Sequence, residues 1–181
     1  ERKSIEPIAL SVEDAKVRAM QHFISDVVWD DARIISRYRG MVTDDMGDAE
    51  GILIFDETSF VKKGNDSAGV SRQYCGSIGK VENCQVGVFA AYASRHGYCL
   101  LGSRLFLPEK WFGEDFAKRR EKCRIPEKSA FKTKPQLAVE LLEEIEREEV
   151  IPFRYVVADA IYGGSPDFLQ AVEKIEGITY M

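Results

Sequence analysis

The stretch that decides the fold is Gly51–Gly64, G-I-L-I-F-D-E-T-S-F-V-K-K-G. Its apolar run, Ile52–Phe55, is short, branched and preceded by glycine, which predicts a buried strand at 52–56. The run ends on Asp56 and Glu57, after which the chain becomes polar and basic. A carboxylate at the end of a buried strand lies at the margin of a sheet, where binding sites are usually built.

The same design recurs about a hundred residues later. Phe153–Ala158 is a second apolar run, and it is followed by Asp159 and then by A-I-Y-G-G. If the two strands lie side by side, Asp56 and Asp159 meet and repel each other. Bound Mg²⁺ removes this conflict, because Mg²⁺ prefers oxygen ligands and is commonly held by one or two carboxylates. The pair therefore predicts a divalent-metal site that needs at least one more acidic ligand.

The remaining patterns predict helices around a mixed sheet. Residues 1–48 are expected to form a helical region, with Ser11 capping a first helix and Asp30 or Asp31 a second. The apolar runs 84–93 and 98–107 predict a hairpin with a four-residue turn, while 59–83 is interpreted as irregular or as an insertion.

A helix is expected to begin at Thr133, with its proline in the first turn, and another at Ser165. The strand–helix–strand order near the end predicts a parallel crossover, whereas the early strands predict antiparallel pairing. The fold class is thus α/β, with three antiparallel strands, then parallel strands and flanking helices. Residues 49–181 are expected to form this core.

Composition excludes several classes of protein. The chain has 181 residues, enough for one domain with a real core, and it lacks the apolar run of about 18 residues that a membrane helix needs. Its four cysteines are far apart, so we expect reduced thiols and a cytoplasmic location rather than structural zinc. The absence of an initiator Met and the abrupt end indicate a fragment of a longer protein.

Charge is distributed unevenly along the chain. Between residues 60 and 134 there are 15 Lys or Arg and 7 Asp or Glu, a net charge of +8, whereas the remainder carries −13. A basic centre between acidic ends is consistent with a polyanionic partner, although a mixed solvated surface would give the same counts.

Four motifs in order resemble the DDE transposases of bacterial insertion sequences. They are D-E-T-S-F-V-K-K-G (56–64), S-R-Q-Y-C-G (71–76), N-C-Q-V (83–86) and A-D-A-I-Y-G (158–163), and R-K-S-I-E-P (2–7) also fits. The resemblance runs through nearly all of the chain. It implies the ribonuclease-H-like fold of retroviral integrases, with Asp56 and Asp159 as the first and second catalytic acids. The family's third acid, a Glu, lies in a later helix that this sequence does not reach.

The resemblance also implies a function. Such an enzyme uses Mg²⁺ or Mn²⁺ to hydrolyse phosphodiesters at element ends and to join the 3′-hydroxyl to target DNA. Its partner is double-stranded DNA in the bacterial nucleoid, bound by a homo-oligomer, with no membrane involved. Two alternatives remain open: a truncated remnant that binds DNA without cutting, and a metal-dependent nuclease or phosphatase of the same fold.

The other candidate residues surround this pair of acids. Glu57 is expected to support the site through hydrogen bonds or to point away, and Tyr74 to pack on the sheet rather than stack on a base. The candidate DNA contacts are Lys62, Lys63, Arg72, Lys80, Arg119 and Arg120, which could equally be solvated.

Overall fold

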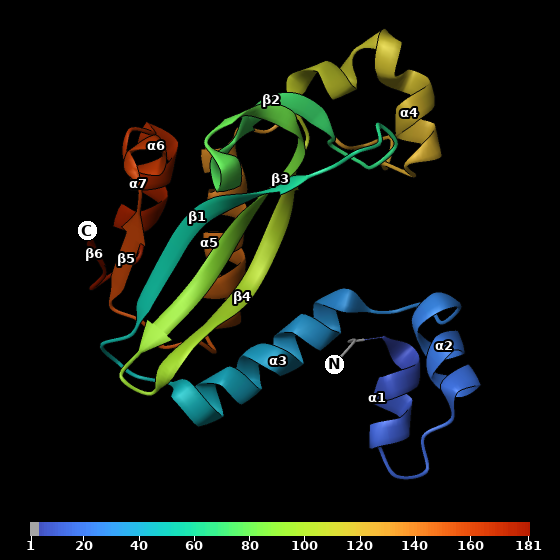
Figure 1. Ribbon diagram of the computed structural model, residues 1–181. Coiled ribbons are helices and arrows are strands. Elements are labelled where there is room, and N and C mark those ends of the chain that lie inside the picture. The colour runs from blue at the N-terminus through green and yellow to red at the C-terminus, as the bar shows by residue number, and fades with distance from the viewer. Residues whose placement is uncertain (1–3) are drawn as a thin grey trace. The chain divides into compact units, whose positions relative to one another are not determined.

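The computed structural model describes residues 4–181 and shows an α/β protein (Figure 1). Arg2 and Lys3 of the R-K-S-I-E-P motif lie outside the described residues. The chain forms two compact units that divide between Ile34 and Ile35, and the functional boundary expected at residue 48 stays a prediction. The division falls inside a helix, because the later part of that helix is buried with the sheet.

Three helices precede the sheet: α1 (Ile5–Ser11), α2 (Val17–Ser25) and α3 (Asp31–Met46). Asp30 caps α3, since its Oδ1 accepts the Arg33 N–H at 3.1 Å. The expected cap at Ser11 is wrong. Ser11 is the last residue of α1, and its hydroxyl donates to the Ile8 carbonyl.

The sheet has six strands: β1 (Ile52–Val61), β2 (Ser71–Cys75), β3 (Lys80–Ser94), β4 (Gly97–Phe106), β5 (Tyr155–Ala158) and β6 (Thr179–Tyr180). Their order is β2-β3-β1-β5-β6, with β4 also paired to β3. Pairing is antiparallel among β1 to β4 and parallel for β1–β5 and β5–β6. This mixed sheet with flanking helices confirms the predicted fold class.

The polar segment 59–83 departs most from its prediction. Parts of it are regular, because β1 continues to Val61, β2 spans 71–75, and β3 already begins at Lys80, whereas 62–70 contains no helix or strand as expected. The long β3 supplies the reason, because its N-terminal half pairs with both β1 and β2. The hairpin turn is also shorter than expected, with only Arg95 and His96 between β3 and β4.

Three helices pack with the sheet: α5 (Lys134–Glu148), α6 (Ala160–Gly163) and α7 (Pro166–Glu173). The capping box expected at Thr133 is present, since Thr133 and Gln136 each accept a backbone N–H from the other. The segment before α5 contains short 3₁₀ turns and α4 (Ala117–Lys122).

The two faces of the sheet differ in what lies on them. Side chains alternate along a strand. One face, the covered face, carries Leu53 and Phe55 of β1 and forms the main core with α5 and α7. The other, the open face, carries Ile54, Asp56 and Phe60 of β1 beside their partners on β3.

Arg39 ties α3 to the covered side. Its side chain is 0% exposed, its guanidinium donates to the Leu101 carbonyl at 3.2 Å, and it pairs with Glu144 and Glu148 of α5 at 2.8 and 2.7 Å. Buried cations require such partners. The last part of α3 is therefore fixed to α5 and β4.

In the described part of the chain, every helix is too short or too polar to cross a membrane.

Candidate active site

Asp56 and Asp159 come from neighbouring parallel strands. In the β1–β5 register Phe55 lies opposite Ala158, so each aspartate is the next residue after a paired position. Neighbouring strands are about 4.8 Å apart. Asp159 follows the end of β5, but Asp56 lies inside β1 rather than at its end, because β1 continues along β3.

Backbone N–H groups orient both carboxylates. The Glu57 N–H donates to Asp56 Oδ1 at 2.7 Å, and the Ile161 N–H donates to Asp159 Oδ1 at 2.9 Å. Asp159 is thereby the N-cap of α6. Both aspartates are exposed, so solvent and a substrate can reach them.

Glu57 lies on the covered face and makes two strong contacts. Its Oε1 is 2.5 Å from Lys134 Nζ at the start of α5, and its Oε2 accepts the Tyr162 hydroxyl at 2.8 Å. The sequence led us to expect that Glu57 either supports the site through hydrogen bonds or points away, and the structure shows that it makes these two contacts. The sequence patterns did not identify Lys134 or Tyr162 as its partners, although Tyr162 belongs to the A-D-A-I-Y-G motif.

The environment of Tyr162 keeps its hydroxyl protonated. Burial raises the pKa of Tyr162, as do its hydrogen bond to Glu57 and the negative charges of Glu57, Asp56 and Asp159. Because the phenol stays neutral, it donates to Glu57 across the ordinary pH range.

The donor set fits a hard divalent cation. Two exposed carboxylates on neighbouring strands are the ligands that Mg²⁺ or Mn²⁺ takes together with water and substrate phosphates. Within residues 4–181, no group of three or more His, Cys, Asp or Glu side chains is gathered closely enough to hold a metal ion. The two aspartates alone would therefore form only part of a coordination shell.

A shallow apolar cavity of about 320 Å³ adjoins Asp56 on the open face. It is lined mainly by Ile54, Phe60, Phe89 and Leu100. Leu100 is 57% exposed and Phe60 is 48% exposed, so this apolar surface borders the carboxylate directly.

The candidate DNA-binding residues differ in what they contact. Lys63, Arg72 and Lys80 are all exposed, and the Nζ of Lys80 lies 3.8 Å from Glu82 Oε2. Arg119 stacks over the Phe116 ring at 5.1 Å. Arg120 donates to the carbonyls of Trp111 and Gly113, so its guanidinium holds the turn before α4. Lys62 is half-buried where β1 ends.

Arg72 shares the face of Asp56. It pairs with Asn83 of β3, which lies two residues from Gln85, the partner of Phe60. Because directly paired residues share a face and side chains alternate, Arg72 projects from the open face.

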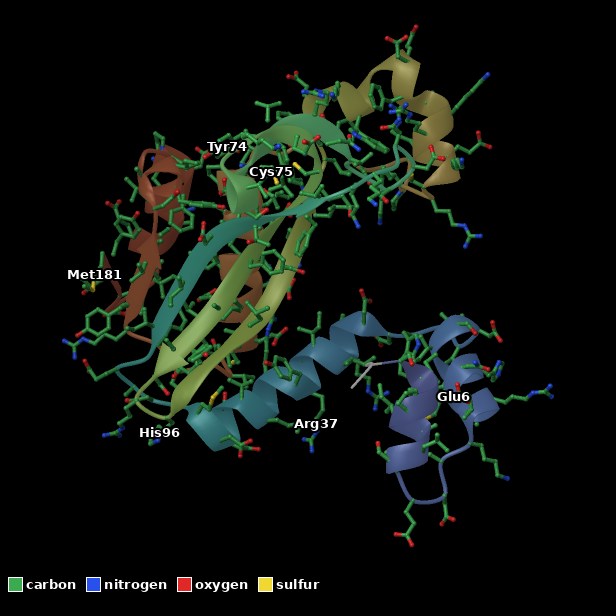
Figure 2. The ribbon with its side chains drawn as sticks, in the orientation of Figure 1. Glu6, Arg37, Tyr74, Cys75, His96 and Met181 are labelled. Atoms are coloured by element: carbon green, nitrogen blue, oxygen red, sulfur yellow. The ribbon has the colours of Figure 1, made fainter. Side chains whose placement is uncertain are left out.

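Tyr74 lies on this open face as well, two residues beyond Arg72 and next to Cys75 at the end of β2 (Figure 2). It is 64% exposed. The expectation that Tyr74 packs on the sheet is therefore wrong: its partner Val81 lies near the tip of the β2–β3 pair and is itself exposed.

Comparison with known proteins gives two matches. The sequence model of the DDE superfamily endonuclease family matches residues 1–179. The chain is also 27% identical over 175 residues to a protein of Microchaete diplosiphon described as a probable transposase for insertion sequence element IS701. That alignment covers 96% of this chain but 42% of the relative. No solved structure matches.

The match to the family extends over both aspartates and nearly every residue of the chain. The chain therefore belongs to the DDE superfamily endonucleases, a family of nucleases.

Proposed function

We propose that this chain is the catalytic core of a DNA transposase, which hydrolyses a phosphodiester at an element end and joins the 3′-hydroxyl to target DNA. The observation that carries the proposal is the β1–β5 register, which brings Asp56 and Asp159 to adjacent positions in a chain of this family. The similarity to the probable transposase of Microchaete diplosiphon supports the same proposal.

Asp56 and Asp159 are the proposed ligands of Mg²⁺ or Mn²⁺. When bound, a pair of such ions supplies an activated water or 3′-hydroxyl and stabilises the leaving oxygen. The chain's own contribution is orientation: the N–H groups of Glu57 and Ile161 fix one oxygen of each carboxylate. A third acidic ligand belongs to this proposal, and we assign it to no residue of the chain.

DNA is proposed to lie along the open face. Arg72 and Tyr74 project from the same face as Asp56, and Lys63 follows the end of β1. Cationic side chains at these positions would contact phosphates, which sets the register of a duplex without reading its sequence. Affinity would then fall with salt, because bound cations release counterions from DNA. We propose that the enzyme acts as a homo-oligomer on paired ends.

The test removes each acid in turn. In the full-length protein, Asp56→Asn and Asp159→Asn should each abolish Mg²⁺-dependent cleavage of an element-end duplex, because a neutral amide is a poor ligand for a hard cation. Binding of the same duplex, measured by electrophoretic mobility shift, should stay close to wild type. Asp45→Asn, an exposed aspartate of α3, is the matched control and should cut normally.

Each other outcome is informative. Cleavage retained in either variant removes that aspartate from the metal site. Cleavage of unrelated duplexes as readily as element ends points to a nuclease without transposition specificity. Binding without any cleavage by the wild type, at saturating Mg²⁺ and Mn²⁺, points to a DNA-binding remnant.

A further inference from the structure

We infer that Glu57, Tyr162 and Lys134 form a positioning link that sets the separation of Asp56 and Asp159. The inference rests on the proposed metal site and goes beyond it, because none of the three is a proposed ligand. A two-carboxylate site depends on the spacing of its ligands, and the link connects the two segments that carry them. Its geometry supports each step of the connection.

The first step joins Glu57 to Asp56. The two are consecutive in β1, and the Glu57 N–H is the group that donates to Asp56 Oδ1 at 2.7 Å. Because side chains alternate, the Glu57 carboxylate points to the covered face while Asp56 points to the open face. A shift of the Glu57 side chain would therefore move the backbone N–H that orients Asp56.

The second step joins Tyr162 to Asp159. The N–H groups of Tyr162 and Gly163 both donate to the Asp159 carbonyl, at 3.2 and 2.9 Å. The helix α6 has only four residues, so it cannot hold its own position. The Tyr162 ring anchors it, since it is fully buried and lies 5.7 Å from the Phe168 ring of α7.

The third step closes the link through charge. The Glu57 side chain is 17% exposed, and a carboxylate so far from water needs charged or hydrogen-bonding partners. Lys134 supplies the charge at 2.5 Å and the Tyr162 hydroxyl the hydrogen bond at 2.8 Å. Lys134 belongs to the first turn of α5, which is held by its capping box. The link thus fixes β1 and α6 against a rigid helix start.

A similar group of three residues at the opposite end of β1 and β5 can be compared with this link. The Tyr155 hydroxyl donates to Glu50 Oε2 at 3.0 Å, and Arg154 pairs with Glu50 at 2.7 Å. This group has the same chemistry of tyrosine, glutamate and cation, but Glu50 is exposed and lies away from both aspartates. It is a matched control for the link.

The decisive experiment measures Mn²⁺ affinity by calorimetry without any substrate. Tyr162→Phe keeps the buried ring and removes only the hydroxyl, so the fold should be retained. We expect Mn²⁺ binding about 10-fold weaker, the range found when residues supporting metal ligands are replaced. Glu57→Ala should weaken it at least as much. Glu57→Gln should recover part of the loss, because its amide oxygen still accepts from Tyr162. Tyr155→Phe should bind like wild type.

Hydrogen exchange of the metal-free protein gives an independent readout. Tyr162→Phe should speed exchange at the amides of 161–163, which are bonded to Asp159, and Tyr155→Phe should not. Unchanged Mn²⁺ affinity in Tyr162→Phe and Glu57→Ala, with a wild type that binds Mn²⁺ and loses it in Asp56→Asn, overturns the inference. A wild type that binds no Mn²⁺, but in which Tyr162→Phe still speeds exchange, instead overturns the proposed metal site.

Discussion

The covered and open faces of one sheet show two different uses of side chains. On the covered face, Leu53 and Phe55 pack with Leu141 of α5 in a core whose members are nearly inaccessible. On the open face, Asp56 and Phe60 of the same strand and Arg72 of β2 project toward solvent. Consecutive residues of β1 therefore alternate between the core, which stabilises the fold, and the face that carries the proposed chemistry.

This separation has a physical consequence. Because neighbouring residues of a strand point to opposite faces, the free energy of unfolding and the binding of DNA can be altered independently. Glu57 is the exception, since it lies on the covered face yet contacts the segment that carries Asp159. The separation predicts large stability losses on one face and small ones on the other.

The largest effect is expected at Arg39. Arg39→Ala leaves Glu144 and Glu148 without their buried cation, and breaking such a pair costs about 3–5 kcal/mol in the free energy of unfolding. Urea unfolding followed by circular dichroism measures it. Arg37→Ala, on an exposed position of the same helix, is the control and should change stability by no more than about 0.5 kcal/mol (Figure 2).

The pH dependence of stability tests the role of Arg39 further. Burial opposes the charge of Glu144, but hydrogen bonds and charges from Arg104 and Arg39 outweigh it and lower the pKa of Glu144. A carboxylate with a lowered pKa stabilises the fold above its ordinary pKa of 4.5, and this contribution is lost as pH falls through the lowered value. The difference between wild type and Arg39→Ala should therefore shrink below pH 4.5. A constant difference would show that Glu144 is not the partner that matters.

The next effect compares two leucines on the two faces. Leu141 is 0% exposed in the core, so Leu141→Ala should cost about 2–5 kcal/mol by leaving a cavity. Leu100 is 57% exposed on β4, and Leu100→Ala should stay within about 0.5 kcal/mol. Equal losses in the two variants, measured by urea unfolding, would contradict the assignment of a single covered face.

Sequence patterns predicted the elements whose apolar residues repeat regularly. The runs before Asp56 and Asp159, and the capping box at Thr133, predicted two strands and a helix that the structure contains. The predicted parallel crossover makes the two strands neighbours, which the β1–β5 register confirms, and the resemblance to the DDE family points to the same two aspartates.

The segment 59–83 was missed because its strands bury polar or small residues. In β2 the inward positions are Ser71, Gln73 and Cys75, so the alternation that reveals a strand is hidden. Lys134 was missed for another reason. Its contact with Glu57 spans 77 residues and depends on how α5 lies against β1, which no local pattern encodes.

The smallest expected effect lies on the open face at Arg72. If Arg72 contacts one phosphate, Arg72→Gln should weaken DNA binding and lower the slope of log K against log salt by about one unit, without changing stability. Arg147→Gln is the control, because it removes the same charge from an exposed position on α5. Fluorescence anisotropy with a labelled duplex at several salt concentrations measures both slopes. An equal change of slope in the two variants would mean that only the net charge of the protein affects binding. That result would contradict the proposal that DNA lies along the open face.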